Sequence, residues 1–115
     1  MSTQFIKTGQ VPTRIDGNAG AAAEVLGEKI CNAKNVVGNL RWLHKGNQLD
    51  ASTPAATHRL VYVMEGDAVI TLDDKDYKVG KGAGVYVGPE ESAMLRPAAD
   101  QTLKLFELIV PEIRE

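Results

Sequence analysis

Apolar residues recur along the chain in short runs, and clusters of Gly, Pro or Asp separate these runs. Many residues within the runs are β-branched or aromatic, which favours strands over helices. Short strands at near-regular spacing, separated by turn residues, predict an all-β sandwich or barrel with antiparallel strands. The expected strands cover residues 36–43, 60–64, 68–72, 77–79, 85–87 and 103–110.

For two other stretches the pattern predicts the local structure less directly. Residues 18–26 have the sequence NAGAAAEVL, whose alanines favour a helix, but a strand that starts near Glu24 fits equally well. A helix there would be too short to stand alone. Residues 73–76 (DDKD) predict a hairpin turn, although they lack the glycine that a tight turn prefers.

Length and composition limit the possible organisation and partners. With 115 residues, the chain has the size of one compact domain, so we expect residues 1–115 to form a single domain. A domain of this size gains stability by pairing, and a homodimer is therefore expected. The formal net charge is −2, with acids and bases interspersed, so the basic face that nucleic-acid binding needs is absent from the sequence.

The sequence also indicates where the protein works. No apolar run approaches the length of a membrane span, and the first residues show no signal peptide, so we expect no membrane partner. Cys31 is the only cysteine, which excludes an intrachain disulfide and makes the reducing cytoplasm the expected compartment. No base lies near Cys31 in the sequence, and we interpret it as a packing residue.

Two segments carry a recognisable spacing. Residues 46–66 read GNQLDASTPAATHRLVYVMEG, and residues 82–97 contain a Gly-rich link followed by a Gly-Pro step. In this spacing the chain resembles the small single-domain cupins, whose motifs are G-x5-H-x-H-x4-E-x6-G and G-x5-P-x-G-x2-H-x3-N. The resemblance covers roughly residues 35–112. It implies an RmlC-like antiparallel jelly-roll barrel, closed at one end, which holds a small ligand in its open mouth.

The resemblance also implies where a metal would bind, and this chain departs from the pattern there. The family's metal-binding histidines and glutamate fall on Ser52, Pro54, Arg59 and Ala93. A divalent metal needs three or four deprotonated N, O or S ligands. Arg59 cannot lose its proton, and its charge repels a cation. We therefore expect no metal and no cofactor at the usual cupin position.

Arg59 is instead the residue from which the ligand hypothesis starts. Alternation along the strand places Arg59, Val61 and Val63 on the inward face. Glu107 is the one charged residue among Leu103, Leu105 and Ile109 on one face of the last strand, where an unpaired carboxylate is costly. One interpretation is an internal ion pair between Arg59 and Glu107. The other is an anion site, in which the guanidinium holds a carboxylate or phosphate with two hydrogen bonds.

Four further side chains are candidates for chemistry. Trp42 is either a packing residue or a wall on which a planar or sugar-like ligand stacks. His44 and His58 are the only imidazoles, and each is either a strand residue without a chemical role or a general base near the mouth. Tyr86 either belongs to the core or offers its hydroxyl to the cavity.

Three classes of function follow from these candidates. The first is a protein that binds a small polar or anionic molecule, such as a carboxylate or a sugar-like compound, through Arg59, Trp42 and Glu107. The second is a metal-independent isomerase, epimerase, cyclase or lyase with His44, His58 or Tyr86 as the proton carrier. The third is a metal-dependent enzyme of the dioxygenase type with relocated ligands such as His44, His58 and Glu107. We expect the first, and the direction in which the two histidines point discriminates among the three.

Overall fold

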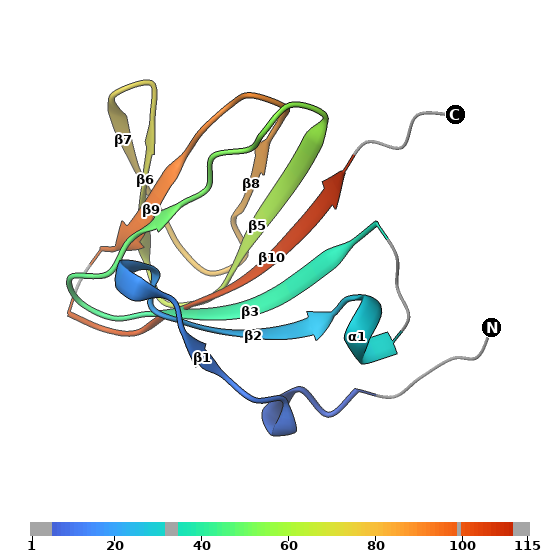
Figure 1. The fold of residues 1–115 in the computed structure, drawn as a ribbon. Coiled ribbons are helices and arrows are strands. Elements are labelled where there is room, and N and C mark those ends of the chain that lie inside the picture. The colour runs from blue at the N-terminus through green and yellow to red at the C-terminus, as the bar shows by residue number, and fades with distance from the viewer. Residues whose placement is uncertain (1–5, 32–34, 99, 112–115) are drawn as a thin grey trace.

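The computed structural model describes residues 6–31, 35–98 and 100–111, and within them strands dominate. Two antiparallel sheets face each other (Figure 1). The larger sheet has the order β1 (Arg14–Ile15), β2 (Ala21–Leu26), β3 (Val37–Leu43), β10 (Leu103–Pro111), β5 (Thr57–Glu65) and β8 (Gly84–Val87). The smaller sheet has the order β4 (Leu49–Asp50), β9 (Met94–Pro97), β6 (Ala68–Leu72) and β7 (Lys75–Val79). This arrangement confirms the predicted antiparallel jelly roll.

The strands predicted from the apolar runs are present as β3, β5, β6, β7, β8 and β10. The helical interpretation of residues 18–26 is wrong. A short 3-10 helix, η2 (Gly17–Ala19), precedes β2, and the remaining residues form that strand, which starts before Glu24. Pairing with β3 decides the conformation, because Ala22 and Ala23 are fully buried against the sheet. The sequence did not predict β1, β4, β9 or the helix α1 (Glu28–Cys31), all of which are short.

The hairpin between β6 and β7 turns at Asp73 and Asp74, as the sequence predicts. Leu72 pairs with Lys75 across the turn, and both aspartates have positive φ values, of 49° and 64°. Aspartate tolerates the left-handed region better than most residues because its short side chain bonds locally to the backbone. The turn therefore forms without a glycine.

Apolar side chains from the inward faces of both sheets fill the space between them. Val61 and Val63 of β5 are fully buried, as are Leu105 of β10 and Leu95 of β9. Cross-strand pairing sets this face: Val63 lies opposite Leu105, and Val61 lies opposite Glu107. The alternation predicted for β5 and β10 is therefore confirmed, and Glu107 points into the barrel with an exposed fraction of 1%.

The segment that contains η2 lies against the barrel beside β4 (Figure 1). The amide of Gln48 donates a hydrogen bond of 2.9 Å to the carbonyl of Asn18. Gly20, which follows η2, has a φ of 77°, and a Cβ atom there would lie 2.1 Å from the carbonyl oxygen of Trp42. Only glycine permits so close an approach to β3. This glycine therefore holds residues 16–19 over one end of the barrel.

Within the described residues, no helix has the length and apolar character needed to cross a membrane.

Candidate functional site

A buried ion pair joins the two central strands of the larger sheet. Glu107 of β10 accepts a hydrogen bond of 2.8 Å from Nε of Arg41, and Nη2 of Arg41 lies 2.6 Å from the same oxygen, Oε1. Both residues are almost inaccessible, with exposed fractions of 5% for Arg41 and 1% for Glu107. Asn39, opposite Glu107 on β3, donates from Nδ2 to Oε1 over 3.4 Å. A carboxylate this deep in the barrel is tolerated because a guanidinium accompanies it.

Arg41 also connects β3 to the segment that contains η2. Its Nη1 donates to Oδ2 of Asp16 over 2.8 Å and to the carbonyl oxygen of Ala19 over 2.9 Å. The hydrogen bond from Arg41 lowers the pKa of Asp16 below its ordinary value of 3.8. Burial acts to lower the pKa of Arg41, but its bonds to Asp16 and the charge of Glu107 outweigh this and raise it. Arg41 is therefore a fixed cation that two carboxylates share.

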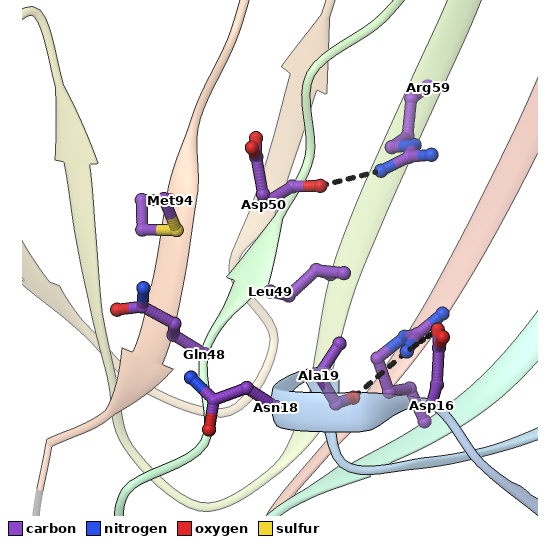
Figure 2. Close-up of a pocket in the computed structure, with 9 residues that line it drawn as sticks. Asp16, Asn18, Ala19, Gln48, Leu49, Asp50, Arg59 and Met94 are labelled. Atoms are coloured by element: carbon purple, nitrogen blue, oxygen red, sulfur yellow. Dashed lines mark hydrogen bonds and ion pairs between the residues drawn. The ribbon is translucent and has the colours of Figure 1, made fainter.

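Arg59 stands apart from this pair. It lies on β5 and extends toward the β4 segment, where Nη1 donates to the backbone carbonyl of Asp50 over a long 3.4 Å (Figure 2). Its Nε atom is buried and has no hydrogen-bond partner, and among the described residues no carboxylate forms a salt bridge with it. The carboxylate of Asp50 accepts hydrogen bonds from the amide and hydroxyl of Ser52, both at Oδ1, and it forms no described salt bridge with Arg59. Arg59 is thus a cation whose hydrogen-bonding capacity is largely unused.

Arg59 and Arg41 line the same pocket. Its volume is about 420 Å³, within the range of small-molecule sites. In Figure 2, Asp16 and Ala19 lie on the side opposite Asp50, with Leu49 between them. The side chains around the pocket come from η2 and β4 with the residues just before them, and from β3, β5 and β9. They are mostly polar: Asp16, Asn18, Ala19, Arg41, Gln48, Leu49, Asp50, Arg59 and Met94.

The prediction that Glu107 pairs with Arg59 is therefore wrong. Arg41 occupies the inward position next to Glu107, because Arg41 shares its face of β3 with the buried Leu43. The sequence contains a signal for this pairing, because Arg41 is the one charged residue of β3. However, both faces of β3 contain apolar residues, so alternation alone could not say whether Arg41 points inward.

Trp42 and His44 lie away from the pocket. Trp42 follows Arg41 on β3 and points to the opposite face of the sheet, where Nζ of Lys104 is 5.8 Å from its ring centroid. Neither it nor His44 is among the residues that line the Arg59 pocket. His44 is exposed just beyond β3, and its Nδ1 lies 3.1 Å from the hydroxyl of Thr102.

His58 and Tyr86 lie together, but on the outer face of the larger sheet. Nδ1 of His58 is 2.6 Å from the hydroxyl of Tyr86, and the two rings stack with centroids 5.9 Å apart. Tyr86 is 61% exposed, and it lines a different pocket near Glu90 and Glu91.

The two histidines do not converge. Leu43, next to His44, pairs with Leu103 at one end of β10, whereas His58 pairs with Val110 at the other end. Seven residues of strand separate these positions, which is roughly 23 Å. A metal or catalytic site that uses both imidazoles is therefore not formed by this fold.

Solved structures share this arrangement of sheets. A predicted oxalate decarboxylase from Thermotoga maritima aligns with a TM-score of 0.80 at 14% identity, over 94% of this chain and 99% of its own. An RmlC-like cupin from Shewanella frigidimarina aligns with a TM-score of 0.74 at 16% identity, over 99% and 95% of the two chains. The fold is that of the cupins. A cupin-fold polyketide cyclase from Streptomyces resistomycificus aligns with a TM-score of 0.77 at 17% identity, over 98% and 82%.

Sequence comparison adds no activity to this fold. No protein-family model matches the chain, and no curated protein matches it in sequence.

The position at which cupins hold a metal does not suit one here. Ser52 and Pro54 are exposed, and the buried residues of that segment are their neighbours Ala51 and Thr53. The hydroxyl of Thr53 donates to the carbonyl of Gly88, so it closes the barrel wall. Ala93 is buried as well, and it offers no ligand. Within the described ranges, no group of three or more His, Cys, Asp or Glu side chains is placed to hold a metal ion.

The buried pair makes a testable prediction about stability. Replacing Arg41 by Met leaves the Glu107 carboxylate buried without a cation, and we expect a loss of about 3–5 kcal/mol in the free energy of unfolding. The double variant R41M/E107L removes both charges and should lose clearly less than the sum of the two single variants. Urea unfolding at neutral pH measures all three.

A matched control is the exposed pair of Arg96 and Asp76, whose side chains lie 3.2 Å apart and are 40% and 56% exposed. Its coupling energy should stay below about 1 kcal/mol because solvent screens it. A coupling between Arg41 and Glu107 as small as that of the control would contradict the role given to the buried pair.

Asp16 predicts a dependence of stability on pH. Because its pKa is lowered in the folded state, its contribution is complete above the ordinary value of 3.8 and disappears as the pH falls through the folded-state pKa. The side chain is 48% exposed, so the contribution is modest, about 0.5–1 kcal/mol. We expect the melting temperature of D16N to lie below that of the wild type at neutral pH and to converge with it in acid. A gap that does not change with pH would show that the carboxylate charge is not responsible.

Proposed function

We propose that this cupin-fold protein binds a small anionic molecule in the Arg59 pocket, without the metal that the fold usually holds. The observation that carries the proposal is the state of Arg59. Its Nε is buried and unpartnered, its one hydrogen bond is long, and it lines a pocket of about 420 Å³. A guanidinium with an unused buried donor and an exposed end at the pocket supports binding of a carboxylate or phosphate.

The surroundings of Arg59 support the same proposal. Glu107 and Asp16, the carboxylates that could have neutralised it, are both engaged by Arg41. The charge of Arg59 is therefore available to a ligand, and the Arg41 pair fixes the floor of the pocket beneath it. Glu107 then acts on the site through Arg41, and Trp42 has no part in binding.

The catalytic alternative rests on a different place in the molecule. The fold neighbour from Streptomyces resistomycificus is a polyketide cyclase, and a metal-independent cyclase or isomerase needs a proton carrier. Here His58 and Tyr86 are hydrogen-bonded at 2.6 Å, but they lie on the outer face, whereas Arg59 faces the opposite side of β5. No described imidazole or phenol lines the Arg59 pocket. This separation favours binding without catalysis.

Binding of cyclohexanecarboxylate tests the proposal. We expect an NMR titration to show binding of the acid by the wild type and none of the uncharged cyclohexylmethanol. R59Q should weaken binding by about 10- to 100-fold, the usual effect of losing a charge-assisted hydrogen bond. R59K should lose part of the affinity, because an ammonium cannot form the paired bonds of a guanidinium.

The control variant is R96Q, which removes an arginine that pairs with Asp76 on the smaller sheet and lies outside the pocket. It should bind the acid as the wild type does. R59Q should keep its free energy of unfolding within about 0.5 kcal/mol, because Arg59 has no ion pair to lose. No binding by the wild type, or binding by R59Q as tight as that of the wild type, would refute the proposal.

We also propose that the protein forms a homodimer through the outer face of β5 and β8. Leu60 and Tyr62 are 43% and 42% exposed there, next to Tyr86. Large exposed apolar side chains that share one face are typical of a contact surface. None of these three carries a charge, so two copies meet without repulsion.

Substitution on this face tests the dimer. L60K places two lysines in a symmetric contact, and we expect it to shift a dimer toward the monomer in light scattering coupled to gel filtration. I15K, which changes an isoleucine that is 82% exposed on β1, at the edge of the larger sheet opposite β8, is the matched control and should leave the dimer intact. A wild-type protein that is monomeric at all concentrations would exclude this contact.

A further inference from the structure

The polar groups around Arg59 indicate which other chemical group the ligand carries besides its anionic group. Asp16 and Asp50 bring carboxylates to the pocket, and Asn18 and Gln48 bring amides whose side chains take part in no described hydrogen bond. One carboxylate oxygen of Asp16 and one of Asp50 take part in no described hydrogen bond. These oxygens and the amide carbonyls of Asn18 and Gln48 can therefore accept hydrogen bonds from a ligand.

The charged side chains around the pocket also favour a hydrogen-bond donor at the second end of the ligand. Among the side chains that line the pocket, Asp16 and Asp50 supply two negative charges and Arg41 and Arg59 two positive ones, so their formal net charge is zero. The charge of Arg41 is already engaged by Asp16 and by the buried Glu107. One carboxylate of a ligand can bind Arg59, because no described acidic side chain forms a salt bridge with this cation. A second negative charge elsewhere in the pocket would meet Asp16 or Asp50 without a free cation to balance it. A hydrogen-bond donor in that position would instead find unused acceptors.

We infer that the ligand is a monocarboxylate that carries a hydrogen-bond donor at its other end, either a hydroxyl or an ammonium group. Its carboxylate binds Arg59, and its donor end lies toward Asp16 and the amides of Asn18 and Gln48. This inference rests on the proposed anion site at Arg59 and adds the chemistry of the second half of the ligand. Dicarboxylates are disfavoured by the same arrangement.

A series of trans-4-substituted cyclohexanecarboxylates tests this inference, because its members share one ring and one carboxylate. The substituent is hydrogen, hydroxyl, ammonium or a second carboxylate. We expect the hydroxyl or the ammonium compound to bind about tenfold more tightly than the unsubstituted acid, as one added hydrogen bond of ordinary or charge-assisted strength allows. The dicarboxylate should bind more weakly than the unsubstituted acid. NMR titration gives all four dissociation constants.

The variant D16N locates the donor end. It should reduce severalfold the preference for the ammonium compound over the unsubstituted acid, a change in the ratio of two affinities that a merely structural role of Asp16 would not produce. Which of the two donor compounds binds more tightly to the wild type distinguishes a hydroxy acid from an amino acid as the natural ligand class.

The outcomes separate this inference from the proposed function. If all four acids bind equally and R59Q abolishes their binding, or if the dicarboxylate binds most tightly, the anion site stands and the inference about the donor is wrong. If none of the acids binds the wild type, both are wrong. A preference for a donor compound that persists unchanged in D16N would also overturn the assignment of the donor end.

Discussion

The contact between Arg41 and Glu107 determines how the rest of the site is arranged. It joins β3 to β10 inside the barrel, at 2.6 Å between Nη2 and Oε1, in a place that water does not reach. The same guanidinium holds Asp16 and the carbonyl of Ala19, so the segment over the barrel end depends on it as well. Because one cation serves both carboxylates, Arg59 has no acidic partner. The availability of Arg59 is thus a consequence of where Arg41 lies.

Alternation along the strands predicted which residues of β5 and β10 face inward. On β3 the same rule failed, for a physical reason. On β5 and β10 the predicted inward residues include Arg59 and Glu107 beside Val61, Val63 and Leu105. The structure pairs them across the two strands as expected and buries all of these except Arg59, which is half-buried. On β3 both faces contain apolar residues, because its outer face packs as well: Leu40 is 7% exposed although it points away from the barrel interior. Alternation alone then does not tell which face of β3 points into the barrel. The sequence could therefore not decide whether Arg41 or Trp42 is the inward residue. The short strands β4 and β9 lack a period altogether, since two and four residues are too few to show one.

The motif spacing was informative about the fold and less so about individual positions. It aligned Ser52 and Pro54 with metal ligands, but the segment is rotated so that Ala51 and Thr53 face inward. Such a segment is fixed by backbone bonds, here from the amide of Ala51 to the carbonyl of Ala93 and from the amide of Thr53 to that of Glu91, and not by side-chain alternation. Neither Ser52 and Pro54 nor Ala51 and Thr53 include a histidine. The conclusion that this position does not suit a metal is therefore the same for both pairs.

The buried polar groups of a barrel need hydrogen-bond partners even where metal ligands are missing. In the described part of this chain, some of these groups have partners and others do not. Among the described residues, three buried side-chain atoms have no hydrogen-bond partner, namely Nε of Arg59, Oε2 of Glu107 and Oδ1 of Asn39. A protein selected for stability alone would fill these positions with apolar residues, because a buried pair is seldom better than a hydrophobic replacement. Arg59 is also of no use in closing the barrel, since its one hydrogen bond is to a backbone oxygen at 3.4 Å. Of these three atoms, only Nε of Arg59 belongs to a residue that lines the pocket, and its unused donor fits the proposed anionic ligand better than the requirements of folding.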